Sequence, residues 1–153
     1  MWSTFDDSNY PKINVNLNGI IKKNEEFHYF INKWDSYNNR KTPYIFIFDC
    51  IDVGMVSIKY SILMSNFIKK LKRKEQYLKS SIIIVKHDYT VFLLKVIFFF
   101  QKPVANVYIT HNSNPEFINN LYEDIMNNKN IDLDNDDLTL VKASKKLINV
   151  KQN

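Results

Sequence analysis

Three aspartates are the residues of this chain best placed for acid–base or metal chemistry. Asp49, Asp52 and Asp88 each lie at or just after the end of an apolar segment that predicts a buried strand. Open α/β sheets bind ligands at the carboxyl ends of their strands, so paired carboxylates there suit proton transfer or Mg²⁺ binding. In the competing interpretation, Asp88 caps a helix and Asp49 accepts hydrogen bonds from loop amides. We favour the second interpretation, because no glycine-rich phosphate loop accompanies the acids.

The histidines and the single cysteine form weaker combinations. His87 and His111 both follow expected strands and, together with Asp88, suit a metal or proton-transfer site; His28 is the third histidine. Cys50 and His87 are formally a nucleophile and its base. Scattered surface histidines and a buried cysteine that packs like a small hydrophobe are the commoner arrangement. We therefore predict no catalytic site, no metal site and no cofactor.

The composition narrows the class of protein further. The 153-residue chain has two glycines, Gly19 and Gly54, which are too far apart to build a dinucleotide fingerprint or a phosphate loop. Its hydrophobic share of 45% and charged share of 24% are typical of a globular domain. The amino terminus carries two aspartates and no apolar core, so we expect no signal peptide and a cytoplasmic, intracellular location.

Apolar strand patterns alternate with helical patterns along the chain. The order β-α-β-α-β-α-β-α predicts one α/β domain with a mostly parallel sheet of four to five strands covered by helices. We assign residues 12–128 to this domain, residues 1–11 to an N-terminal extension and residues 129–153 to a peripheral C-terminal tail. The expected strands cover residues 12–20, 43–50, 81–86 and 103–109, and the expected helices begin near Asn24, Val56, Asp88 and Asn114.

Two helical segments suggest surfaces for partners. The basic run from Lys69 to Lys79 suits nucleic acid or anionic lipid, as does the net charge of +5. The run contains Glu75 and a single arginine, so we interpret it mainly as a solvated helix face. Residues 91–100 are apolar on nearly all sides, which indicates either deep burial or a contact patch for a protein or a membrane. This segment is too short for a transmembrane helix and is interrupted by Lys95.

The chain resembles a STAS domain, the anti-sigma-factor-antagonist fold whose architecture is shared with lipid-binding CRAL-TRIO domains. Residues 15–19 resemble the opening strand that ends in glycine, residues 45–49 the central strand that ends in aspartate, and residues 81–85 the next strand. The resemblance covers most of residues 12–126. It implies regulation by phosphorylation of a serine in a turn before the long helix, where this chain has Ser57-Ile58-Lys59-Tyr60. The usual phosphorylatable serine and glycine are missing from this turn, so kinase regulation is not expected here.

The sequence thus predicts a non-enzymatic module that binds a protein partner or a second copy of itself. The candidate contact residues lie at the start of the long helix and on the apolar segment: Met55, Val56, Ser57, Lys59, Phe98 and Phe99. Two alternatives stay open, a domain that binds lipid or a small ligand and a structural subunit of a larger assembly such as a virion. Nucleic acid is the less favoured partner.

Overall fold

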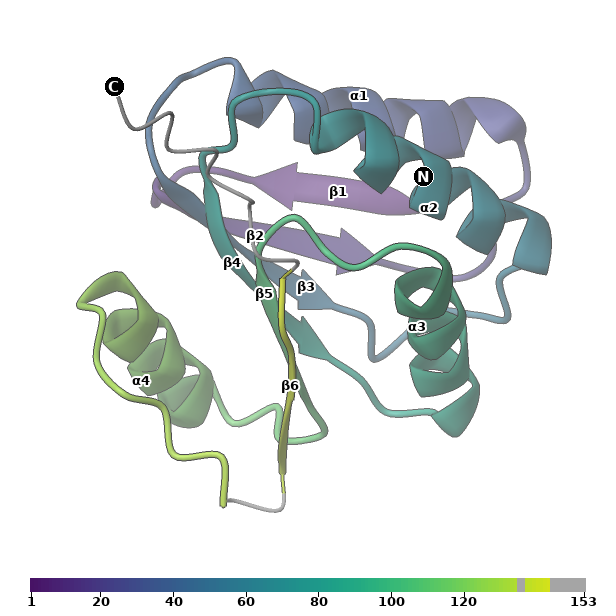
Figure 1. Cartoon of the computed structure of the whole chain (residues 1–153). Helices are drawn as coiled ribbons and strands as arrows, with labels where there is room; N and C mark the ends of the chain where they lie inside the picture. The colour runs from purple at the N-terminus through teal and green to yellow at the C-terminus, as the bar shows by residue number, and fades with distance from the viewer. Residues whose placement is uncertain (135–136, 144–153) are drawn as a thin grey trace.

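The chain is organised around a mixed sheet whose strands lie side by side in chain order (Figure 1). The computed structural model describes residues 1–134 and 137–143. Strands β2 to β5 are parallel, and β1 and β6 pair antiparallel with the two outer parallel strands. The strands are β1 (Ser3–Asp6), β2 (Lys12–Leu17), β3 (Tyr44–Asp49), β4 (Leu78–Ile84), β5 (Asn106–Thr110) and β6 (Leu138–Val141).

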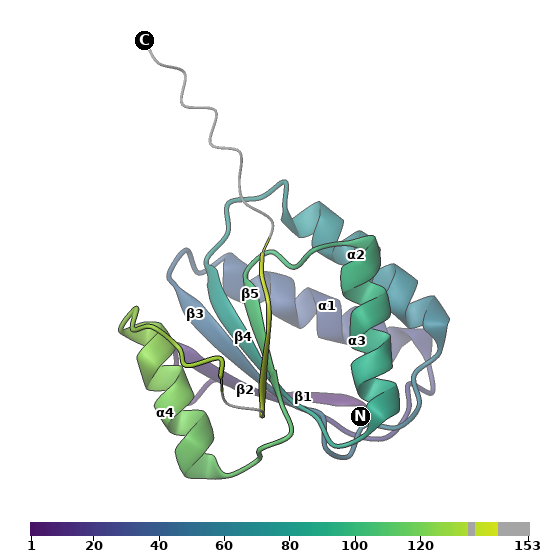
Figure 2. The same ribbon diagram turned by 60° about the horizontal axis from the view of Figure 1, so that its bottom comes forward.

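The helices cover the two faces of this sheet unequally. α4 lies alone on one face, and the other helices pack on the opposite face (Figure 2). Each of the first three helices connects two neighbouring parallel strands, and right-handed crossovers of this kind place consecutive helices on the same face. The helices are α1 (Asn24–Asn38), α2 (Ile58–Leu71) and α3 (Asp88–Phe100) on one face, and α4 (Pro115–Met126) on the other.

The α/β class and the four parallel strands agree with the prediction, but the sheet is wider and mixed. β1 lies in the segment that we set apart as an extension, and β6 lies in the predicted tail. Phe5 of β1 packs against Phe30 and Phe46, with ring centroids 5.9 and 6.4 Å away. Both edge strands have four residues, which is too short for a recognisable alternating pattern. Of the predicted tail, residues 135–136 and 144–153 lie outside the described residues.

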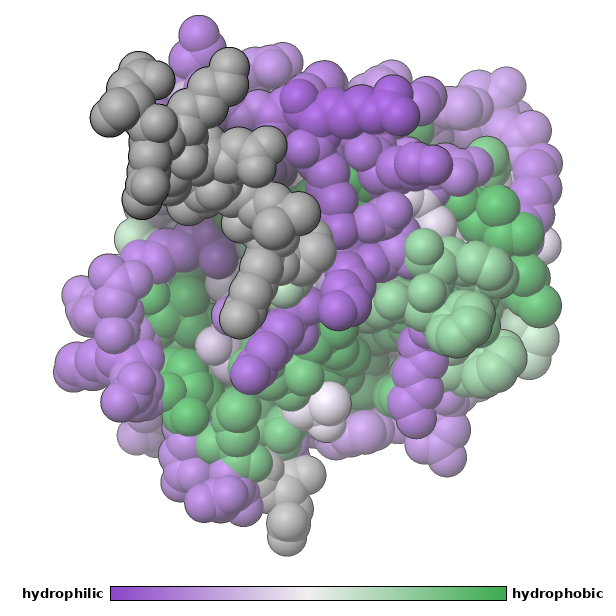
Figure 3. Space-filling model, in the orientation of Figure 1, coloured by the Kyte–Doolittle hydropathy of each residue, from purple (hydrophilic) through white to green (hydrophobic). Residues whose placement is uncertain are grey.

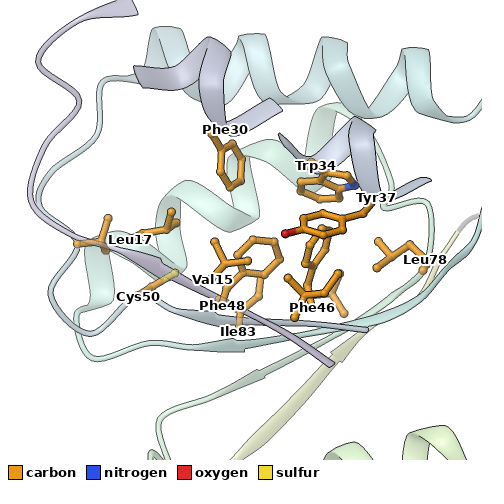
Figure 4. Close-up of a cluster of buried hydrophobic side chains, with 14 of the residues drawn as sticks. Val15, Leu17, Phe30, Trp34, Tyr37, Phe46, Phe48, Cys50, Leu78 and Ile83 are labelled. Carbon is orange, nitrogen blue, oxygen red and sulfur yellow. The ribbon is translucent and has the colours of Figure 1, made fainter. Parts of the chain in front are cut away.

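An aromatic core holds the helices against the sheet on the three-helix face (Figure 4). The Trp34 ring of α1 lies 5.0 Å from that of Phe46 and 5.7 Å from that of Phe48, both on β3. It also meets Phe67 of α2 edge-on at 5.6 Å. Aromatic pairs at these separations contribute about 0.5–1.5 kcal/mol each beyond the area they bury. Trp34 therefore joins α1, α2 and the centre of the sheet in one contact network.

A second core lies between the sheet and α4. Ile45 and Ile47 of β3 point to this side, whereas Phe46 and Phe48 point to the aromatic core. Leu121 and Ile125 of α4 pack on these isoleucines. Because β3 is buried on both faces, its sequence is apolar at consecutive positions rather than at every second one.

The two glycines of the chain join the loops that follow β2 and β3. The amide of Gly54 donates to the carbonyl of Gly19 at 2.7 Å, and the amide of Gly19 donates to the carbonyl of Asp52 at 2.9 Å. Gly19 has a φ of 70°, in the left-handed region that favours glycine. A Cβ atom on Gly54 would lie 3.1 Å from the Gly19 backbone. Glycine therefore lets these loops approach each other at the carboxyl edge of the sheet.

Replacing Gly19 tests the role of its backbone conformation. Gly19→Ala should lower the free energy of unfolding by about 1–2 kcal/mol, because alanine is disfavoured in the left-handed region. An added Cβ meets no atom within 4 Å, so no steric clash contributes. Urea denaturation measures the change. Gly19→Asn is the matched control and should cost less, since asparagine tolerates this conformation; equal losses in the two variants would contradict the explanation.

Candidate functional site

Exposed hydrophobic side chains gather on neighbouring parts of α2 and α3. Figure 3 shows hydrophobic residues over α3 and beside the start of α2. We call this group the α2–α3 apolar surface, and its members are between 47% and 84% exposed: Met55, Ile58, Ile62, Phe92, Phe99 and Phe100. Contiguous apolar exposure of this kind marks a contact surface more often than scattered exposed residues do.

Hydrogen bonds hold α3 beside α2 and beside the loop after β3. The Ser65 hydroxyl of α2 donates to the Ile97 carbonyl of α3 at 3.2 Å. The Tyr89 hydroxyl at the start of α3 donates to the Val53 carbonyl at 2.7 Å. The two segments predicted to contact a partner, the loop region around residue 55 and the helix around residue 98, are thus adjacent in the fold.

Residues 91–100 pack against the core on one side of α3 and are exposed to solvent on the other. Val91, Leu94 and Phe98 are partly buried and pack against the aromatic core. Phe99 is 84% exposed, and Phe92 is exposed on the same face, seven residues earlier. Sequence reasoning named Phe98 and Phe99 together but missed Phe92, which the i, i+7 spacing with Phe99 would have indicated.

The predicted contact residues before and within α2 also differ in their surroundings. Met55 is 72% exposed, whereas Val56 is partly buried against the core. The Ser57 hydroxyl accepts a hydrogen bond from the Lys59 amide at 3.3 Å and caps α2. The Lys59 ammonium donates to the Asn24 side chain at 3.2 Å. Ser57 and Lys59 therefore contribute to the local fold, and Met55 is the residue of this segment most open to a partner.

Lysines border the α2–α3 apolar surface. Lys95 lies three residues after Phe92 and four before Phe99, so it shares their helical face. Lys69 lies seven residues after Ile62 on the exposed side of α2. This border is positively charged around an apolar centre.

Two lysines of the basic run from Lys69 to Lys79 contact different parts of the fold. The Lys74 ammonium pairs with the Asp35 carboxylate of α1 at 3.0 Å. The Lys79 ammonium donates to the Met126 carbonyl at the end of α4, on the opposite side of the sheet. Lys74 and Lys79 therefore do not share one surface.

Among the acidic and histidine candidates, Asp49 and His87 make local contacts. The Asp49 carboxylate accepts a hydrogen bond from the Ile51 amide at 3.0 Å, as the second interpretation expected. Asp88 lies in the first turn of α3 and makes no side-chain cap, and the cap position belongs to His87. The His87 ring stacks on Tyr89 at 5.1 Å. Among residues 1–134 and 137–143, no group of three or more His, Cys, Asp or Glu is arranged to hold a metal ion.

Cys50 is buried in the aromatic core at the end of β3. Burial, with a smaller contribution from the nearby Asp49 carboxylate, raises the pKa of its thiol to about 12. The thiol is therefore protonated at neutral pH and is a poor nucleophile.

In the part of the chain that the structure describes, no helix is long and apolar enough to span a membrane.

The raised pKa of Cys50 predicts slow alkylation in the folded protein. At about pH 8 the native chain should react with iodoacetamide at least about tenfold more slowly than the chain unfolded in urea, because thiolate is the reactive form. Intact mass measured over time gives both rates, since the chain has one cysteine. Equal rates for the folded and unfolded chains would show that the thiol is accessible and ionised, contrary to this geometry.

The chain was also compared with other proteins. No model of a protein family, no curated protein and no solved structure matches it. The evidence for a function is therefore the geometry of the α2–α3 apolar surface and the chemistry of its lysine border.

Proposed function

We propose that this protein is a non-enzymatic interaction module that binds another protein through the α2–α3 apolar surface. The observation that carries the proposal is the exposure of three phenylalanines on α3, Phe92, Phe99 and Phe100, beside Met55 and the start of α2. Aromatic residues and methionine are enriched where proteins bind each other. Burying these side chains on binding would supply the hydrophobic free energy of association.

The partner that fits this surface presents apolar side chains flanked by acidic ones. Lys95 lies between the exposed phenylalanines of α3, and Lys69 borders the exposed face of α2. Opposite charges at the rim of an interface favour specific and fast association. A second copy docked on the same face would bring like charges together, which is unfavourable, so we favour a different protein over self-association.

The resemblance to STAS domains supports the same surface. In that family the turn before the long helix controls partner binding, and the corresponding turn here adjoins Met55 and begins α2. Because Lys59 is part of this turn, the turn carries a permanent positive charge that does not depend on phosphorylation. The proposed module therefore binds its partner without kinase control.

The chemistry of the candidate catalytic groups also favours binding over catalysis. The Cys50 thiol is protonated and buried, and Asp49 is held by a loop amide. The thiol would have to lose its proton before it could attack a substrate.

Site-specific photocrosslinking tests the proposed surface. Phe99 replaced by p-benzoylphenylalanine should give a defined protein adduct in native lysate, because this side chain is the most exposed of the α2–α3 apolar surface at 84%. Excess wild-type protein should suppress the adduct, whereas excess Phe99→Asp should not. Mass spectrometry of the adduct should reveal a partner segment with apolar and acidic residues.

The matched control places the same crosslinker at Leu133, an exposed hydrophobic residue in the loop between α4 and β6. This position should not capture the same partner. Phe99→Asp should keep the free energy of unfolding within about 0.5 kcal/mol of the wild type, because it is a surface substitution. Adducts that contain only a second copy of the chain, or only lipid, would refute the proposal.

A further inference from the structure

An apolar cavity lies between the sheet and the inner sides of α1, α2 and α3. Its volume is about 140 Å³, and apolar atoms make up nearly all of its lining. A cavity of about this size, lined by Leu, Ile and Phe, stays dry in another protein and binds benzene or xenon. The cavity in this chain is therefore large enough for a small apolar ligand.

The lining residues show that the cavity is elongated. Leu17 and Cys50 line it at the carboxyl end of the parallel strands, and Leu78 and Ala105 line it near their opposite end. Figure 4 shows Leu17 and Cys50 at one end of the buried cluster and Leu78 at the other. A cavity of modest volume that extends along the strands suits a narrow, linear molecule better than a round one.

Two buried polar atoms lie in the lining without partners. Trp2 and Thr90 line the cavity and are each 6% exposed. The Trp2 Nε1 and Thr90 Oγ1 atoms have no hydrogen-bond partner among the residues that the structure describes. Unpaired buried polar groups are rare in folded proteins, since each loses its bonds to water on burial. An oxygen atom on a ligand would give either group a partner.

Both polar side chains belong to the same end of the cavity. The Trp2 carbonyl accepts a hydrogen bond from the Asn18 amide, next to the junction of the two glycine loops. Thr90 follows Tyr89, whose hydroxyl binds the Val53 carbonyl in the same junction. One end of the cavity is thus able to hydrogen-bond, and the end at Leu78 and Ala105 is apolar.

We infer that this cavity binds a short, linear, uncharged molecule with one oxygen group at its end, such as an aliphatic alcohol or aldehyde. The ligand oxygen lies at the end of the cavity that Trp2 and Thr90 line, and the hydrocarbon chain extends toward Leu78 and Ala105. The ligand is neutral because no charged side chain of the described residues lines the cavity, and an unpaired charge there would be costly. The inference depends on the interior of the protein and not on the α2–α3 apolar surface.

The covering of the cavity gives a ligand a route inward. Every residue of α3 is described, and Thr90 alone among them is buried. Val91, Leu94 and Phe98 are only partly buried against the core, so opening α3 exposes the contacts of this one helix. Local opening of α3 would therefore admit a ligand without unfolding the sheet.

Tryptophan fluorescence of the full chain measures this binding directly, because the only two tryptophans, Trp2 and Trp34, both line the cavity. The probes are 1-propanol to 1-octanol. Affinity should rise about fourfold for each added carbon and then level off when the chain outgrows the cavity. Hexanoate at neutral pH should bind at least about tenfold more weakly than 1-hexanol.

Three variants distinguish the cavity from other sites. Thr90→Val should weaken 1-hexanol binding about three- to tenfold, because it removes the hydroxyl and keeps the shape. Ala105→Leu should abolish binding by filling the apolar end; if circular dichroism shows that it does not fold, the smaller Ala105→Val takes its place. Phe99→Asp, which alters only the outer surface, should bind 1-hexanol like the wild type.

Several results would overturn the inference. These are no fluorescence change with any alcohol, an affinity that rises with chain length without levelling off, and equal binding of hexanoate and 1-hexanol. Retained binding in the folded Ala105 variant would show that the alcohol binds elsewhere. Loss of binding in Phe99→Asp would place the alcohol on the α2–α3 apolar surface and would leave the protein-binding proposal to be decided by crosslinking.

Discussion

The handedness of the strand connections is the constraint on which the rest of this structure depends. Four parallel strands follow one another in space as they do in sequence, so the three connecting helices must share one face. α1 packs toward the β1 edge of that face, α2 lies between the other two helices, and α3 comes last in the row. Since α2 is its only helical neighbour, α3 keeps one side in contact with the core and leaves the other exposed. The α2–α3 apolar surface is a consequence of this position.

The same arrangement accounts for the cavity. Large rigid rings dominate the core under α1, where Trp34, Phe46 and Phe48 pack edge-on and tilted. Flexible or smaller side chains line the space under α2 and α3, among them Met64, Ser61 and Ala105. Trp34 and Phe48 border the cavity on the α1 side, and the smaller residues under α2 and α3 leave its volume unfilled. One crowded half and one sparse half of a single core therefore lie beneath the three helices.

The carboxyl edge of the sheet, where α/β proteins commonly bind ligands, is used here for structure. Gly19 and Gly54 bond the two loops to each other, and Asp49 holds its own loop through the Ile51 amide. Groups that would attract phosphate or metal ions are thereby engaged in the backbone. The interior below this edge holds the apolar cavity, and the helical surface beside it carries the exposed phenylalanines.

The candidate site was only partly predictable from the sequence. The apolar character of residues 91–100 is a local property, so the sequence identified the segment that carries the exposed phenylalanines. It did not separate Phe98, which packs inward, from Phe99, which points outward, because a helix that is apolar all round has no polar face to set its orientation. It also gave no sign that Trp2 lines a cavity with Thr90, since these residues are distant in the chain.

Local patterns in the sequence determined the α/β class, the four parallel strands and the start of α4 at Asn114, whose side chain accepts a hydrogen bond from the Glu116 amide at 2.9 Å. Runs of apolar residues, helical spacing and capping residues act within a few positions, so they can be recognised without the fold. Only the tertiary structure decided the edge strands β1 and β6, the contact between the two glycines and the position of α3. Each of these depends on pairing between segments far apart in sequence, where the free energy comes from burial and backbone hydrogen bonds that no local pattern records.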